Sequence, residues 1–230
     1  LPICTAKGQA IVNFLQLTGE EKVANVLSMK DLTPFKFLVM VTKNGVFKKV
    51  ELAEFKNIRR SGLIAIKLKA GDRLRWVRPS TGKDDIMLVT ANGQSIRFKE
   101  ADVRGMGRNA AGVRGMRLKG NDEVSGMDLI DGGKAGEAEQ LLTVMANGFG
   151  KRTSLKAYKV QGRGGSGIKT AKITDKTGKI AGAVIVETKI ESQDIIVISQ
   201  KGQVIRLPMK SVSVLGRDTQ GVRVMKFNDP

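Results

Sequence analysis

The sequence has no histidine, a single cysteine (Cys4) and only 4% aromatic residues. A chain without histidine cannot build the usual cysteine–histidine zinc site, and one cysteine cannot form an internal disulfide. The Gly-x-x-x-x-Gly-Lys-(Ser/Thr) loop that cradles nucleotide phosphates is missing as well. We therefore expect no catalytic site, no metal and no cofactor within this chain.

Long apolar runs are also missing. No segment approaches the ~18 consecutive apolar residues of a membrane-spanning helix. Residues 1–7 lack the apolar stretch of a signal peptide. The single cysteine fits a reducing compartment. We therefore expect a cytoplasmic protein, or a piece of one, that does not contact a membrane.

Acidic residues are scarce compared with basic ones. The chain carries 40 Lys and Arg against 22 Asp and Glu, a formal charge of +18 with a pI near 10.2. Such an excess indicates a polyanionic partner. Nucleic acid is the first candidate, and an acidic membrane surface is a second that we do not adopt. Hydrophobic residues make up 41% of the chain, so its core must be built mainly from aliphatic side chains and methionine.

Glycine marks an internal repeat. Five glycines, which we call the anchor glycines, recur at spacings of 54, 50, 55 and 54 residues: Gly8, Gly62, Gly112, Gly167 and Gly221. A period of about fifty residues is typical of propellers and solenoids. The sequence thus predicts one domain over 1–230, with repeats at 1–36 (partial), 37–85, 86–140, 141–193 and 194–230 (partial).

Each full repeat contains four strand-like segments. The first segment of each repeat spans 37–42, 86–90, 141–145 or 195–199, and a tight turn follows it. Three of these turns contain Asn-Gly, a strong hairpin signal. A second strand follows each turn, a third begins at the anchor glycine, and a fourth is expected to form a second hairpin with the third. Four-stranded units repeated radially predict an all-β, propeller-like disc.

A basic residue stands four positions after each turn glycine, in the second strand. In two of the four copies apolar residues flank the base, and period-two alternation predicts that the base points outward while these neighbours point inward. The residues are Lys49, Arg97, Arg152 and Arg206.

The connections between the second and third strands, which we call the rim loops, concentrate the positive charge. They span 56–61, 104–111, 156–166 and 210–220, and together they hold ten basic residues and one acidic residue, Asp218. Equivalent loops of a radial array share one rim, so a basic belt at the edge could hold curved duplex DNA by phosphate contacts. The alternative, scattered charges that only solvate a surface, does not account for their repeated positions.

The end of the 156–166 rim loop and the anchor glycine after it read Gln161-Gly-Arg-Gly-Gly-Ser-Gly167, which we call the box-like segment. The glycines would let the backbone approach a phosphate and leave amides pointing outward, with Arg163 forked onto phosphate oxygens. A tight glycine turn before a strand explains the same composition. The residues alone leave both interpretations open.

This segment resembles the gyrase A box, Gln-(Arg/Lys)-Arg-Gly-Gly-(Arg/Lys)-Gly, from which it departs at Gly162 and Ser166. The repeats, with Thr-Ala-Lys-Gly-Gln-Ala-Ile-Val-Asn-Phe-Leu at 5–15 and Val-Arg-Gly-Met-Arg-Leu at 113–118, resemble the C-terminal domain of DNA gyrase A. The resemblance implies a β-pinwheel, a six-bladed propeller relative that exchanges strands between blades. It also implies that the first blade, with a full box, lies upstream of Leu1.

The resemblance further implies a non-catalytic domain that wraps double-stranded DNA without sequence preference. Its partners would be the rest of the gyrase A protein and the gyrase B protein, in the bacterial cytoplasm at the chromosome, where other domains use ATP and magnesium. The residues expected to bind DNA are Lys49, Arg59, Arg60, Arg97, Arg104, Arg108, Arg114, Arg152, Gln161, Arg163, Gly164, Gly165, Gly167, Lys169, Arg206, Arg217 and Arg223.

Two alternatives stay open. The related C-terminal domain of the topoisomerase IV A protein would serve substrate selection and bending with less wrapping. A propeller that binds proteins would instead carry neutral rims and aromatic hot spots, which the basic rim loops and the few aromatic residues disfavour.

Overall fold

The computed structural model describes residues 21–28, 32–56, 62–132, 139–187 and 193–227. Over these residues the regular structure consists of β-strands and short 3-10 helices. None of the helices described is long and apolar enough to cross a membrane.

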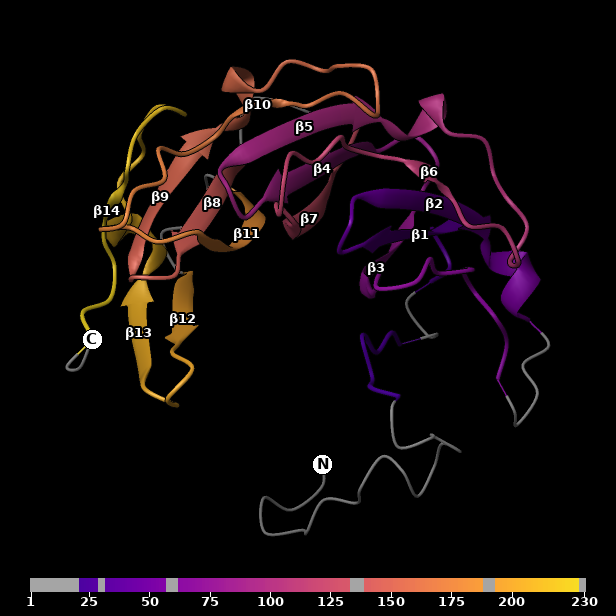
Figure 1. The fold of residues 1–230 in the computed structure, drawn as a ribbon, viewed down its shortest axis with the longest axis horizontal. Coiled ribbons are helices and arrows are strands. Elements are labelled where there is room, and N and C mark those ends of the chain that lie inside the picture. The colour runs from indigo at the N-terminus through magenta and orange to yellow at the C-terminus, as the bar shows by residue number, and fades with distance from the viewer. Residues whose placement is uncertain (1–20, 29–31, 57–61, 133–138, 188–192, 228–230) are drawn as a thin grey trace, which may run out of the picture.

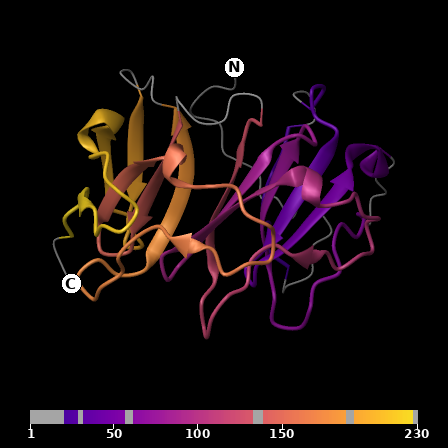
Figure 2. The same ribbon diagram turned by 90° about the horizontal axis from the view of Figure 1, so that it is seen from above.

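The strands form three four-stranded antiparallel sheets and a two-stranded hairpin. Each sheet stands beside the next along an open arc (Figure 1), and the strands run across the thickness of that arc (Figure 2). From the outer to the inner edge the sheets are β6-β2-β1-β3, β10-β5-β4-β7 and β14-β9-β8-β11, followed by the hairpin β13-β12. The bounds are β1 Phe37–Thr42, β2 Val46–Glu51, β3 Leu74–Ser80, β4 Asp85–Thr90, β5 Gln94–Lys99, β6 Val113–Arg114, β7 Val124–Ile130, β8 Glu139–Met145, β9 Phe149–Ser154, β10 Ile168–Lys169, β11 Ile180–Glu187, β12 Asp194–Ile198, β13 Val204–Pro208 and β14 Val222–Arg223.

The first hairpin of each repeat is confirmed. Strands β1 and β2 pair antiparallel, as do β4 with β5, β8 with β9 and β12 with β13. The turn glycines Gly45, Gly93 and Gly148 have φ of 78°, 84° and 78°, values that residues with a Cβ atom rarely adopt. The hairpin turns predicted from Asn-Gly are therefore present.

The expected second hairpin is wrong. The third strands β6, β10 and β14 are only two residues long, and each pairs with the second strand of the preceding repeat rather than with its own fourth strand. The fourth strands β3, β7 and β11 pair instead with the first strands β1, β4 and β8. Every four-stranded sheet thus borrows its outermost strand from the next repeat, as the pinwheel resemblance implied.

The anchor glycines sit where the borrowed strand meets its host sheet. A Cβ atom at Gly112 would lie 2.7 Å from the carbonyl oxygen of Phe47, and one at Gly167 would lie 2.3 Å from that of Ser95. Gly221 meets Gly150 in the same way, at 2.6 Å. These are equivalent host positions, so the repeat spacing of glycine records one recurring close approach of two backbones.

Replacing Gly167 with alanine should lower the free energy of unfolding by about 2–4 kcal/mol, since it adds both a strained φ and a backbone overlap. Gly71 is the matched control, because its φ of 75° is nearly that of Gly167 (74°) but its Cβ would have no described atom within 4 Å. Gly71→Ala should cost about 1–2 kcal/mol. Urea unfolding compares the two, and equal losses would contradict the close-approach explanation.

The core fills the spaces between neighbouring sheets. One cluster joins β2 to β4 and β5, with Phe47 and Phe98 packed edge-to-face at 5.4 Å between ring centroids. A second joins β4 to β8 and β9 and includes Tyr158, whose hydroxyl lies 2.6 Å from the Thr170 hydroxyl. Apart from these rings the clusters are mainly aliphatic or methionine, as the composition predicted.

Candidate nucleic-acid interface

Each described rim loop crosses the outer side of the preceding repeat's sheet. The amide of Met106 donates to the Lys49 carbonyl at 2.8 Å, and that of Gln161 donates to the Arg97 carbonyl at 2.7 Å. The amide of Leu215 donates to the Arg152 carbonyl at 2.8 Å. The rim loops are therefore fixed on equivalent positions of β2, β5 and β9, at the convex edge of the arc (Figure 1).

Because the loops cover these strands, the expectation that the second-strand bases point outward is wrong for three of them. Lys49, Arg97 and Arg152 keep only 5%, 8% and 7% of their accessible surface. Alternation predicts exposure only when one face of a sheet meets water, and here both faces are covered. Arg206 is exposed, and no described rim loop crosses its strand.

The buried bases have internal partners, and in each case one of these partners stands twelve positions earlier. Arg97 binds the Asp85 carboxylate through Nε and Nη2, at 2.9 and 2.7 Å. Arg152 donates to the Gln140 side chain at 2.9 Å. Lys49 Nζ lies 4.8 Å from the Phe37 ring centroid and donates to the Glu100 carbonyl at 3.1 Å. These side chains support the sheet and are not available to a ligand.

Solvent-accessible bases meet in pairs where one repeat joins the next. Arg163 Nη1 lies 3.4 Å from the Arg114 carbonyl, and Arg217 Nη1 donates to the Lys169 carbonyl at 2.9 Å. Arg217 is half-buried, and the other three residues are exposed. The two contacts are equivalent in the repeat. Each donor arginine stands four residues before the anchor glycine of its own repeat, and each acceptor stands two residues after the anchor glycine of the preceding repeat. The accessible charges therefore recur at successive junctions along the outer edge.

One acidic residue lies within this row. Asp218 binds Lys169 Nζ at 2.7 Å, and this bond holds the pKa of the carboxyl below its usual range. Both side chains are exposed, so the pair is open to exchange with another anion.

The other expected DNA-binding residues are placed as follows. Arg104 and Arg223 are exposed, and Arg223 lies 4.9 Å over the Phe149 ring. Arg108 is half-buried, with its Nε 3.7 Å from Glu54. Arg59 and Arg60 lie outside the described residues.

The box-like segment uses its backbone internally. The Gly164 amide donates to the Gly115 carbonyl at 2.7 Å, and the Gly165 carbonyl accepts from the Arg117 amide at 2.8 Å. Gly164 has φ 78°, a value that favours glycine in a turn. The Gly164 amide does not point outward, so of the two interpretations left open a tight turn explains the glycine at this position. The Arg163 side chain is exposed.

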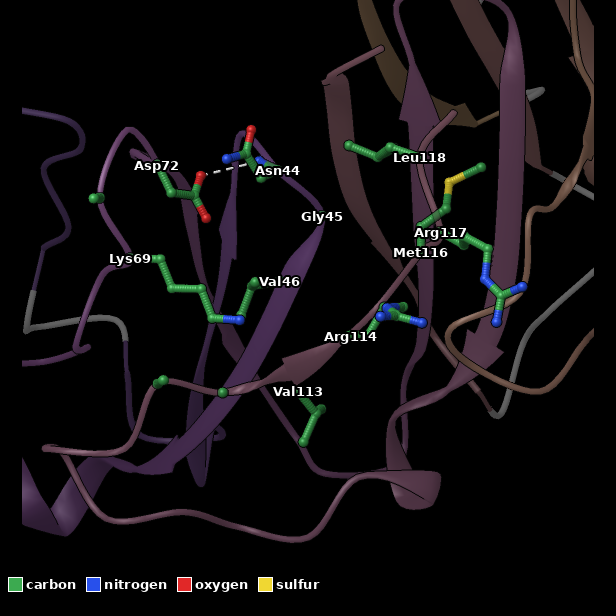
Figure 3. Close-up of a pocket in the computed structure, with 13 residues that line it drawn as sticks. Asn44, Gly45, Val46, Lys69, Asp72, Val113, Arg114, Met116, Arg117 and Leu118 are labelled. Carbon is green, nitrogen blue, oxygen red and sulfur yellow. Dashed lines mark hydrogen bonds between the residues drawn. The ribbon is translucent and has the colours of Figure 1, made fainter. Parts of the chain in front are cut away.

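A hollow of about 660 Å³ opens beside β6 (Figure 3). Lys69 and Asp72 line it from the turn before β3, and Arg114 and Arg117 line it from the third-strand segment. The Asp72 carboxylate accepts from the Asn44 amide at 3.0 Å and ties the two turns together. A smaller hollow of about 230 Å³ follows one repeat later, lined in part by Asn92, Arg117, Lys119, Asp122 and Gly167.

Lys69, Arg117 and Lys119 were not among the residues predicted to bind DNA. All three are exposed and line these hollows. The signal was available for Arg117, which stands five residues after its anchor glycine, as do Lys67 and Lys172.

Two buried lysines were also missed. Lys48 and Lys151 stand three residues after their turn glycines, and both side chains are fully buried. Burial lowers the pKa of Lys151 to about 8 and lowers the pKa of Lys48 as well. Their ammonium groups bind the rim loops from beneath.

Comparison with known proteins agrees with this architecture. A family model described as DNA gyrase C-terminal domain, beta-propeller, matches residues 36–81, 84–131, 139–187 and 193–230. The chain belongs to this family. Both the expected family and the all-β pinwheel-type fold are thereby confirmed.

The relatives of this gyrase-family chain include two staphylococcal proteins. DNA gyrase A of Staphylococcus epidermidis (strain ATCC 12228) is 40% identical over 225 residues, which cover 97% of this chain and 24% of that protein. DNA gyrase A of Staphylococcus aureus (strain NCTC 8325) is 38% identical over 225 residues, covering 97% of this chain and 25% of that protein. The chain spans about a quarter of the length of these curated relatives.

Two solved structures are also similar. The C-terminal domain of DNA topoisomerase IV matches with a TM-score of 0.85 at 27% identity, covering 95% of this chain and 66% of that one. The DNA gyrase A C-terminal domain matches with a TM-score of 0.84 at 27% identity, covering 97% of this chain and 73% of that one.

Proposed function

We propose that this chain is a non-catalytic DNA-binding domain that bends and wraps duplex DNA around its basic outer rim. It would present a DNA segment to the cleavage gate of a type IIA topoisomerase for ATP-dependent supercoiling. The rest of the gyrase A protein, the gyrase B protein, ATP and magnesium belong to that larger enzyme, which works at the chromosome in the bacterial cytoplasm.

The observation that carries the proposal is the pairing of solvent-accessible bases at successive junctions. Arg114 with Arg163, and Lys169 with Arg217, repeat one arrangement along the convex edge. Duplex DNA resists bending, and curving a few tens of base pairs costs several kcal/mol. A rim that offers phosphate contacts at regular intervals offsets this cost without reading bases.

Titration of random-sequence duplex DNA at increasing salt tests the proposal. We expect log K to fall linearly with log salt, with a slope of about −0.9 for each phosphate neutralised, and equally for unrelated sequences. A fluorescence anisotropy series measures it. A slope near zero would refute the DNA-binding proposal and favour a protein-binding propeller.

The similarity to the topoisomerase IV domain supports a second candidate, a domain that bends DNA and selects substrates. Closed-circular DNA relaxed in the presence of the domain separates the two. Wrapping should leave a change of linking number of constant sign that grows with domain concentration, whereas bending without wrapping should leave none.

A further inference from the structure

The buried ends of Lys48 and Lys151 lie beneath two rim loops in equivalent positions. Lys151 Nζ donates to the Gly216 and Arg217 carbonyls at 2.7 and 2.6 Å and to the Thr219 hydroxyl at 3.0 Å. An ammonium group has three N–H donors and no acceptor, so these three acceptors saturate it.

Lys48 makes the corresponding contacts under the 104–111 rim loop. Its Nζ donates to the Ala65 carbonyl at 2.7 Å, to the Ala110 carbonyl at 2.8 Å and to the Arg108 carbonyl. Arg108 and Arg217 both stand four residues before their anchor glycines. Each lysine therefore holds the main chain of the rim-loop arginine that we assign to DNA.

The intervening rim loop is held differently. Ile96 occupies the equivalent position of β5, and its Cδ1 lies 3.6 Å from where a Cβ of Gly165 would be. This loop is the box-like segment, whose glycine backbone makes its own bonds to the strand segment below it. A buried lysine is thus present where the loop lacks the glycine-rich sequence and absent where the loop has it.

We infer that Lys48 and Lys151 are positioning residues for DNA binding, which fix the 104–111 and 210–220 rim loops in the conformation that presents Arg108 and Arg217 to phosphate. The inference rests on the proposed function. Neither lysine contacts DNA itself, because both are fully buried. The charge is retained inside the fold because removing it would leave two or three loop acceptors without donors.

The principal variant is Lys151→Ile, because Ile96 and Ile205 show that the repeat accepts isoleucine at this position. Lys151→Met, closer in shape, is the second variant should the first fail to fold. Lys83→Ile is the matched control, since Lys83 is an exposed residue outside the predicted DNA-binding set and the substitution removes the same charge.

Amide hydrogen exchange on the full chain tests the positioning directly. In Lys151→Ile the amides of 213–219 should exchange at least tenfold faster, while those of 161–167 keep their wild-type rates. Unchanged exchange in 213–219 would overturn the inference even if the wild-type chain failed to bind DNA. Such a failure would separately overturn the proposed function.

DNA affinity tests the functional half. We expect Lys151→Ile to bind random duplex about tenfold more weakly near 0.1 M salt, as for the loss of one phosphate contact, while Lys83→Ile stays within about twofold. In an Arg217→Ala background, Lys151→Ile should add little further loss, because the lysine acts through that arginine. Additive losses, or faster loop exchange with unchanged affinity, would overturn the positioning role.

Discussion

Replacing Arg114, Arg163 and Arg217 together with alanine should weaken binding of duplex DNA about a thousandfold near 0.1 M salt, since each phosphate contact contributes about tenfold there. The slope of log K against log salt should become shallower by about 2.7, which is three contacts at about 0.9 each. The loss should be the same for unrelated sequences, because phosphate contacts carry no base information.

The control for this triple variant removes equal charge from the opposite edge. Arg73, Arg75 and Arg78 are exposed in and beside β3, the innermost strand of its sheet. Their replacement with alanine should change affinity by less than about tenfold and leave the slope nearly intact. Equal effects of the two triple variants would show that net charge, and not the rim, determines binding.

Replacing Asp85 with alanine should lower the free energy of unfolding by about 3–5 kcal/mol, because it leaves the Arg97 guanidinium buried without its bonded carboxylate. Both side chains of this pair are 9% exposed. Thermal or urea unfolding followed by circular dichroism measures the loss.

The chain supplies its own control for this prediction. Arg206 and Asp194 form the equivalent pair in the β12–β13 hairpin, with Arg206 Nη2 2.5 Å from Asp194 Oδ2. Here the arginine side chain is 75% exposed and the aspartate side chain 29%. Asp194→Ala should cost no more than about 1 kcal/mol. Similar losses at the two sites would mean that burial does not determine the contribution of this recurring pair.

The hairpins and the repeat could be predicted from sequence because their causes are local. An Asn-Gly turn needs positive φ at its glycine, and the anchor glycines are spaced by a contact that recurs once per repeat. Both features can be recognised from the identity of a few neighbouring residues.

The partner of the third strand could not be predicted in this way. Strands β6, β10 and β14 have two residues each, too few to show an alternating pattern. Their host strands lie more than sixty residues earlier, as Val113 pairs with Phe47. Only the resemblance to a known family indicated strand exchange.

The error at Lys49, Arg97 and Arg152 has the same origin. Strand alternation, clearest where Ile96 and Phe98 flank Arg97, suggested a solvated face for these bases. The loop that covers each base lies further along the chain and is not visible in the strand's own pattern. The exposure of the rim-loop bases Arg104 and Arg163 could be expected from the sequence, since loops at the edge of a sheet run over the protein surface.

The borrowed strands also determine how a mechanical load would travel through the domain. A force applied to one rim loop is transmitted to the sheet of the preceding repeat through hydrogen bonds. It is transmitted to the loop's own repeat through the covalent chain. The amides of Lys67, Arg117 and Lys172 add a further link, each bonded to a carbonyl two residues before the next anchor glycine. Tension applied at any point of the edge is thus divided between neighbouring sheets, so the arc should resist straightening as one elastic unit.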